Sequence, residues 1–154
     1  MAPYRAGVIP MIDSVHDGQR YFCYGVDATY KTLIDLGGHI EAIDTSYAQT
    51  AYREFSEETL GALGNTITLA QVAQAPFVYD DDTLDYLVLL PSQTDLAAIQ
   101  RRFAQQLAMD STGHPEVIDL VWLTYDQLAK LADDQIYFRS RRLISRFPEA
   151  VRFA

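Results

Sequence analysis

The stretch from Gly37 to Gly61 reads GGHIEAIDTSYAQTAYREFSEETLG. Within it, Glu54, Glu57 and Glu58 have the i, i+3 and i+4 spacing that places three side chains on one face of a helix. Like charges at this spacing destabilise a helix unless something neutralises them, and Mg²⁺ prefers carboxylate and phosphate oxygens as ligands. The stretch therefore predicts a helix whose acidic face binds a hard divalent cation.

The ends of this helix are also marked in the sequence. Ser46 followed by Gln49 is a capping-box pattern, and Gly61 is suited to the left-handed residue that ends a helix. Gly37-Gly38 follow an apolar run at 32–36 and predict a tight loop between a strand and the helix, whose backbone can approach an ion or a phosphate. The other helix face carries residues suited to a core: Ala48, Ala51, Tyr52, Phe55 and Thr59.

These residues resemble the Nudix box, G-x5-E-x7-R-E-U-x-E-E-x-G-U, in which U is an aliphatic residue. The match covers Gly38 and the run 53–58, REFSEE. The sequence departs from the pattern in three places: Asp44 stands where the pattern has Glu, and Arg53 and Gly61 each come one residue late. The resemblance implies a Nudix-type α/β/α sandwich with a mixed β-sheet, in the α/β class, formed by a single domain over residues 1–154.

The resemblance also implies a metal site. Its ligands are expected to be Glu54, Glu57 and Glu58, with the carbonyl of Gly38 as a further ligand. The expected cation is Mg²⁺, with Mn²⁺ as the alternative. Such a cation neutralises phosphate charge and orients a phosphate chain, so the implied reaction is hydrolysis of a diphosphate linkage in a small nucleotide or nucleoside-diphosphate derivative. The chain is then a pyrophosphohydrolase, which is a hydrolase acting on acid anhydrides.

Two further roles are implied around this site. Arg53 is expected to orient the glutamates through ion pairs without touching the metal, and its own partner is either Asp44 or Glu41. The general base is either Glu54 or Glu116, because family members use a glutamate of the box or a carboxylate from a later loop. Glu116 ends a loop just before a predicted strand, which is where the second kind of base is found.

The nucleobase specificity is not set by the sequence. The aromatic residues available for a base-binding slot are Phe77, Tyr79, Tyr86 and Trp122. By resemblance, a tyrosine past the box indicates diadenosine polyphosphates and a proline there indicates ADP-ribose, and both Tyr79 and Pro76 lie near that distance. Trp122 lies on an alternating strand, so a core position is favoured over a stacking role.

Two alternative functions stay open. A Nudix-like domain that senses a nucleotide with little turnover is compatible with the departures from the box. An RNA-end pyrophosphohydrolase is suggested by the segment 136–154, which carries five arginines and one glutamate. A solvated basic helix is the favoured interpretation of that segment, because the chain as a whole has a net charge of −9, which argues against a broad nucleic-acid or anionic-membrane surface.

Composition sets the remaining expectations. The chain has 154 residues and an ordinary globular composition, without an apolar run long enough to span a bilayer or to act as a secretory signal. The single cysteine, Cys23, lies in an apolar strand pattern and is expected to be a buried structural thiol, which favours a cytoplasmic location. A small-molecule nucleotide is the expected partner, nucleic acid and membrane are not, and the family resemblance makes a homodimer one expected assembly.

Hydrophobic patterns predict the other elements. Strands are expected at 4–12, 20–26, 31–36, 66–79, 84–90 and 117–123, with Pro10 favouring an edge position for the first and Pro76 breaking the fourth. Helices are expected at 95–109, 125–132 and 135–147. In the first of these helices, Leu96, Ile99, Phe103 and Leu107 form the apolar stripe.

Overall fold

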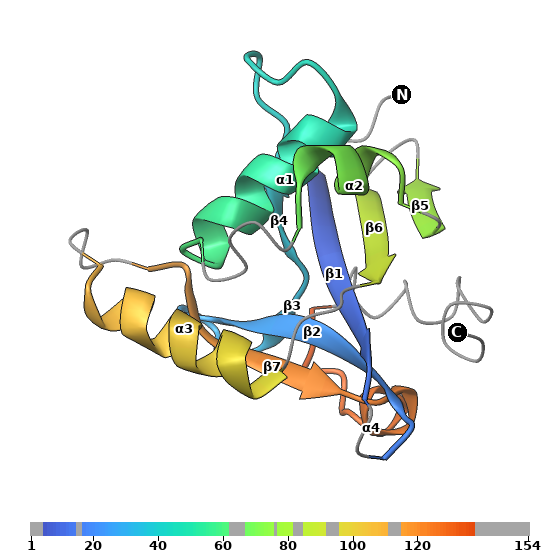
Figure 1. Ribbon diagram of the computed structural model, residues 1–154, viewed down its shortest axis with the longest axis vertical. Coiled ribbons are helices and arrows are strands. Elements are labelled where there is room, and N and C mark those ends of the chain that lie inside the picture. The colour runs from blue at the N-terminus through green and yellow to red at the C-terminus, as the bar shows by residue number, and fades with distance from the viewer. Residues whose placement is uncertain are drawn as a thin grey trace.

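The computed structural model of the protein describes residues 5–14, 17–61, 67–75, 77–81, 85–91, 96–110 and 115–137. For the described residues between 77 and 97, it describes the backbone but not the side chains. The elements follow one another along the chain as shown in Figure 1. They are β1 (Arg5–Asp13), β2 (Arg20–Asp27), β3 (Leu33–Ile34), β4 (Leu36–His39), α1 (Tyr47–Glu58), α2 (Leu69–Ala73), β5 (Phe77–Asp81), β6 (Asp85–Pro91), α3 (Leu96–Ala108), β7 (Val117–Leu123) and α4 (Tyr125–Ala129).

The strands form one mixed sheet with β1 at its centre. The order is β3-β2-β1-β6-β5, and β4 pairs with β1 while β7 pairs with β2. Only β1 and β6 run parallel among the described pairs. The predicted edge position of Pro10 is therefore wrong. Pro10 pairs with Leu90 on one side, and on the other side it lies between the end of pairing with β4 at Val8 and the start of pairing with β2 at Met11. A residue without an N–H is thus accommodated at a break in the ladder.

Helices cover both faces of the sheet, which gives the expected α/β/α sandwich. Alternate residues of β1 point to opposite faces, so Val8 joins one core cluster and Ile9 the other. The first cluster includes residues of α1, α2 and α3, whereas the second includes Leu128 of α4. Figure 1 shows α1 near β1 and β4, α2 beside α1 and β6, and α3 alongside β7.

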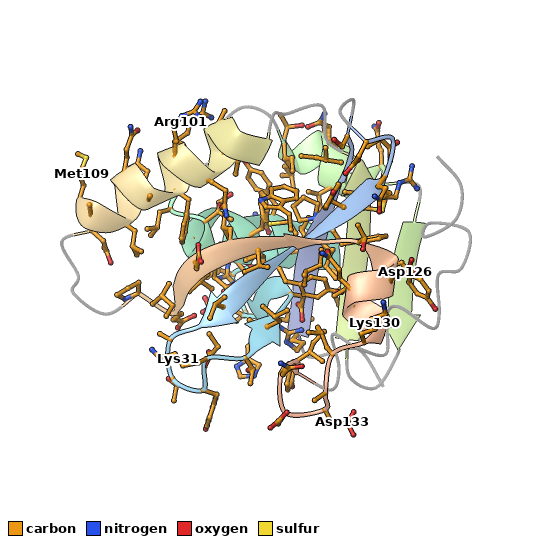
Figure 2. The ribbon with its side chains drawn as sticks, turned by 90° about the horizontal axis from the view of Figure 1, so that it is seen from below. Lys31, Arg101, Met109, Asp126, Lys130 and Asp133 are labelled. Carbon is orange, nitrogen blue, oxygen red and sulfur yellow. The ribbon has the colours of Figure 1, made fainter. Side chains whose placement is uncertain are left out.

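The helix α3 confirms its predicted stripe where side chains are described. Ile99 and Phe103 are buried, and Leu107 packs against the same cluster. Figure 2 shows Arg101 and Met109 on the outer surface of this part of the structure. Within the described residues, no helix combines the length and the apolar character needed to cross a membrane.

Both ends of α1 differ in detail from the prediction. The hydroxyl of Ser46 accepts a hydrogen bond from the Gln49 backbone at 3.1 Å, as a cap should, but the Gln49 side chain accepts from the backbone of Thr45. At the other end, Leu60 takes the left-handed position with φ 54°, and Gly61 follows it with φ 70°. The hydrogen bonds from Leu60 to Glu57 and from Gly61 to Ser56, at 3.2 and 3.1 Å, form a Schellman motif.

Two other predicted elements are wrong. Within the strand expected at 66–79, residues 69–73 form the helix α2, whose N-cap Thr68 forms a complete capping box with Gln71, and the described strand of this range begins at Phe77. The helix expected at 135–147 is absent where the structure describes it. Residues 135–137 are not helical, and Ile136 bridges to Leu33 beside β2. The rest of that predicted helix lies outside the described residues.

The glycine pair lies within β4 and not in a tight loop. Gly37 pairs with Gly7 of β1, and a Cβ on Gly37 would clash with the carbonyl oxygen of Ala6 and lie 2.6 Å from the Cα of Gly7. The backbones approach too closely for any side chain at this point. The three atoms nearest to a Cβ on Gly38 all belong to the carboxylate group of Glu54, with Oε1 at 2.7 Å.

These contacts predict different costs for two neighbouring substitutions. Gly37→Ala should lower the free energy of unfolding by about 3 kcal/mol, because the new methyl group meets backbone that must move. Gly38→Ala should cost less than about 1 kcal/mol, because a flexible side chain can turn away. Urea unfolding followed by circular dichroism measures both. Equal losses in the two variants would contradict this account of the glycine pair.

Candidate active site

The acidic face of α1 lies beside β4. Glu54 has a side chain that is 13% exposed, and its carboxylate lies directly against Gly38. Glu57 is 61% exposed on the same helix. Glu58 is the most enclosed of the three, because its Oε2 atom is buried. The structure thus brings Glu54 against Gly38, and the three carboxylates of α1 lie in different environments.

Arg53 links this helix to the loop that follows β4. Its Nε donates to Oδ1 of Asp44 at 3.0 Å and its Nη2 donates to Oδ2 at 2.9 Å. Glu41, the alternative partner, is 4.0 Å away and 56% exposed. A two-pronged bond to a carboxylate that is 2% exposed is the stronger interaction. These bonds hold the pKa of Asp44 well below its usual range.

The same guanidinium group contacts the glutamates. Its Nη1 donates to Oε1 of Glu54 at 2.9 Å and lies 3.6 Å from Oε1 of Glu57, while Nη2 donates to the carbonyl of His39 at 3.2 Å. Arg53 therefore fixes where two carboxylates of α1 point. Burial nevertheless raises the pKa of Glu54, against the lowering effect of the Arg53 contact.

Arg53 does not lower the pKa of Glu58 in the same way. Its Oε2 atom is buried and has no hydrogen-bond partner within the described part of the structure. Burial is the largest cause, and together with the negative charges of Asp35, Glu54 and Glu116 it raises the pKa of Glu58 to about 9, against the lowering effect of Arg5. A buried carboxylate without a partner is costly when it is ionised, so this position favours either a proton or a cation.

The donor set fits a hard divalent cation. Carboxylate oxygens are the ligands that Mg²⁺ and Mn²⁺ take in proteins, and the unpartnered oxygen of Glu58 is free to bind one. Among the described residues, no three carboxylate, imidazole or thiol groups converge closely enough to hold one ion as they stand. Arg53 holds Glu54 and Glu57, so these two side chains would have to turn for all three glutamates to hold one ion.

A cavity of about 590 Å³ opens beside Glu58. Its walls come from the end of β2 and the loop after it, from Ile34, and from the loop that leads into β7. Lys31, labelled in Figure 2, marks the first of these loops. The lining residues include Asp27, Thr29, Glu58, Glu116 and Val117. The two loops are tied together because the Ala28 N–H donates to the Glu116 carbonyl at 2.8 Å.

The structure places the two candidate bases differently. Glu116 is exposed and lines the same cavity as Glu58. Glu54 is held by Arg53 at 2.9 Å and is not part of the cavity wall. Both carboxylates nevertheless lie close enough to Glu58 to raise its pKa.

Three residues near the site were missed by sequence reasoning. Arg5 and Asp35 form a buried ion pair with N–O distances of 2.8 and 2.9 Å. Both lie in apolar runs, where a single charged residue is easily taken for a surface position. Thr50 is fully buried, and its hydroxyl donates to Asp44 at 2.7 Å. The sequence gives no signal for this role, because Thr50 lies on the side of α1 that carries Arg53 and not in the apolar stripe.

Other residues singled out in the sequence have core roles or lie outside the described part of the structure. Trp122 is partly buried and packs against the first core cluster, so its core role is confirmed. Cys23 is buried, and burial raises the pKa of its thiol, as expected for a structural cysteine. The side chains of Phe77, Tyr79 and Tyr86, together with Pro76 and the arginine-rich segment from 138 onward, lie outside the described residues.

No protein-family model and no curated protein matches the sequence significantly. Similar solved structures include Shewanella oneidensis NrtR. The NrtR chain complexed with a 27mer DNA aligns at TM-score 0.55 and 16% identity, over 96% of this chain and 61% of NrtR. This chain therefore spans less than two thirds of that protein. The NUDIX domain of NrtR complexed with ADP ribose aligns at TM-score 0.54 and 15% identity, over 97% and 88% of the two chains.

Two other similar structures are a Caenorhabditis elegans Ap4A hydrolase and the Nudix hydrolase RenU from Mycobacterium smegmatis. The first aligns at TM-score 0.55 and 18% identity, over 93% of both chains. The second aligns at TM-score 0.57 and 13% identity, over 96% of this chain and 84% of RenU. These likenesses confirm the Nudix fold that the resemblance implied.

The environment of Glu58 predicts how stability depends on pH. Its pKa is about 9 in the folded protein against an ordinary 4.5, so between these values the folded state keeps a proton that the unfolded chain releases. The free energy of unfolding of the metal-free protein should therefore fall as pH rises from about 5 to about 8, by at most about 1.4 kcal/mol per pH unit. Asp44, whose pKa is lowered, is ionised in both states over this range and adds no slope.

Glu58→Gln should remove most of this slope and make the variant more stable than wild type near pH 8; the slope that remains comes from Glu54, whose pKa is also raised by burial. Urea unfolding at several pH values in the presence of a chelator measures this pH dependence of the free energy of unfolding. Glu57→Gln is the matched control on the exposed part of the same helix and should keep the slope. Parallel pH profiles for wild type and Glu58→Gln would contradict the burial of an unpartnered carboxylate.

Proposed function

We propose that this protein is a metal-dependent hydrolase that cleaves a diphosphate linkage in a small nucleotide or nucleoside-diphosphate derivative. The observation that carries the proposal is the unpartnered, buried oxygen of Glu58 at the wall of a cavity of about 590 Å³. A cation satisfies that oxygen and attracts a phosphate chain. The cavity is in the size range of small-molecule sites, so it has room for the rest of a nucleotide.

In this proposal Glu54, Glu57 and Glu58 hold Mg²⁺ or Mn²⁺, with the Gly38 carbonyl as a further ligand. When bound, the cation neutralises charge on the phosphates and makes the phosphorus easier to attack. Arg53 orients the glutamates through its contacts with Glu54 and Glu57, at 2.9 and 3.6 Å. It does so without becoming a ligand itself, because a guanidinium group has no lone pair to give.

Glu116 is the residue we assign as general base. It lines the cavity beside Glu58, whereas Glu54 is held by Arg53 outside the cavity wall. The Glu116 carboxylate takes a proton from the attacking water as the water oxygen bonds to phosphorus. The bond from that phosphorus to the bridging oxygen breaks, and the bridging oxygen leaves on the other phosphate.

The names of two similar structures support a nucleotide substrate. One is an Ap4A hydrolase, and another is a NUDIX domain complexed with ADP ribose. Adenosine attached to a phosphate chain is common to both molecules. We therefore place adenosine polyphosphates and ADP-ribose-type molecules first among the substrates to be tested.

A nucleotide-sensing domain with little turnover is the second candidate function. It is favoured by the ion pairs that Glu54 and Glu57 form with Arg53, because these contacts compete with metal binding. It is also favoured by the likeness to NrtR, which was crystallised both with DNA and, as its NUDIX domain, with ADP ribose. An RNA-end pyrophosphohydrolase rests on the arginines beyond residue 137, and no described contact supports it.

The hydrolase predicts metal-dependent release of phosphate groups from part of a nucleotide panel. The panel should contain nucleoside triphosphates, ADP-ribose, dinucleoside polyphosphates and capped RNA, each with Mg²⁺ or Mn²⁺, and a phosphatase should be added to reveal monophosphate products. Glu57→Gln should lower the rate at least about 100-fold, because a ligand is lost. Asp126→Asn, on the surface of α4, removes a carboxylate far from the site and should leave the rate unchanged (Figure 2).

The outcomes separate the two candidates. Turnover that needs the metal and is lost in Glu57→Gln supports the hydrolase and gives its substrate class. Nucleotide binding without turnover in either metal supports the sensing domain. If Glu57→Gln and Asp126→Asn both react like wild type, Glu57 is not a ligand and the metal site is elsewhere.

A further inference from the structure

A buried threonine lies behind the ion pair of Arg53 and Asp44. Thr50 is on α1, three residues before Arg53, so both side chains are on the same side of the helix. It is fully buried, although threonine is neither apolar nor a strong helix former. Its hydroxyl oxygen lies 2.7 Å from Oδ2 of Asp44. A polar group in this position must have a partner, and here the partner is a charged one.

The hydroxyl of Thr50 has two possible acceptors. Thr50 Oγ1 is also 3.4 Å from the carbonyl of Ser46, the contact that threonine often makes within a helix. A hydroxyl donates only one proton, and the shorter contact to an ionised carboxylate is the stronger bond. The hydroxyl of Thr50 therefore donates to Asp44.

Asp44 depends on a small number of donors. Its side chain is 2% exposed, so water cannot replace a lost hydrogen bond easily. Arg53 supplies two donors, and the backbone N–H of Glu41 supplies a third at 3.0 Å. The Glu41 donor belongs to the same short loop as Asp44. Thr50 is thus the donor that ties the Asp44 carboxylate to the rigid body of α1 independently of Arg53.

We propose that Thr50 is a positioning residue that fixes Asp44, so that Asp44 in turn holds Arg53 in the orientation that aims Glu54 and Glu57. Asp44 is one carbon shorter than the glutamate of the Nudix pattern, so its carboxylate reaches Arg53 only if the loop stays close to the helix. The Thr50 hydroxyl keeps it there. The effect on metal binding rests on the proposed function, whereas the effect on Arg53 does not.

Isosteric and conservative substitutions test this role. Thr50→Val keeps the shape and removes the hydroxyl, while Thr50→Ser keeps the hydroxyl. Thr59→Val is the matched control, because Thr59 is a second buried threonine of this region and its hydroxyl donates to the Phe55 carbonyl at 2.8 Å, away from Asp44. If valine prevents folding at position 50, Thr50→Ala takes its place.

The first readout is the Arg53 Nε–H signal in ¹⁵N NMR of the metal-free protein, assigned with Arg53→Lys. A guanidinium group fixed on a carboxylate exchanges this proton slowly. Thr50→Val should broaden the signal or speed its exchange, and Thr50→Ser should restore it. The second readout is Mn²⁺ affinity, which should fall about tenfold in Thr50→Val, the lower end of the range for residues that act through a ligand. Thr50→Ser should recover most of that loss.

The possible results are distinct. An Arg53 signal that is the same in Thr50→Val and wild type overturns the positioning role. So do equal losses of signal and affinity in Thr50→Val and Thr59→Val, because they show a general loss of stability. If wild type binds no Mn²⁺ and turns over no nucleotide, the proposed function fails, and the Arg53 signal alone still decides the role of Thr50.

Discussion

The bond between Arg53 and Asp44 is the interaction on which the acidic face of α1 depends. It joins a helix to the loop after β4 through two hydrogen bonds of 3.0 and 2.9 Å to a nearly inaccessible carboxylate. Because one end is fixed in this way, the remaining N–H groups of Arg53 are aimed at Glu54 and at the His39 carbonyl. A cluster of like charges that would otherwise weaken the helix becomes an ordered network.

The network leaves one glutamate without a positive partner. Arg53 serves Glu54 and Glu57, but Glu58 lies deeper and is surrounded mainly by other negative groups. Ionising a buried carboxylate costs several kilocalories per mole unless a charge of opposite sign is close, so the folded protein keeps it protonated near neutral pH. In the proposed function, a divalent cation takes the place of that proton.

Sequence patterns predicted the helix and its acidic face because both depend on local spacing and on caps that are visible in the chain. The capping signal was reliable, and the same signal at Thr68 and Gln71 also marks α2, which β-prone neighbours obscured. The roles of Thr50 and of the Arg5–Asp35 pair were not predictable, because they depend on partners that are distant in sequence or hidden in an apolar run. The position of Leu60 in the left-handed region shows that the helix ends where its hydrogen bonds require, even one residue before the glycine.

The two glycines of β4 show how closely the fold and the site are built together. Successive residues of a strand face opposite sides, so Gly37 and Gly38 make room for different neighbours. On one side, Gly37 and Gly7 lie against the buried carboxylate of Asp35, which Arg5 neutralises. On the other side, Gly38 makes room for the carboxylate of Glu54. The strand β4 is thin here because its glycines lie between the carboxylates of Asp35 and Glu54. The negative charge of Asp35 also raises the pKa of Glu58. Part of the negative charge that raises the pKa of Glu58 therefore comes from the core of the sheet, where Asp35 is paired with Arg5.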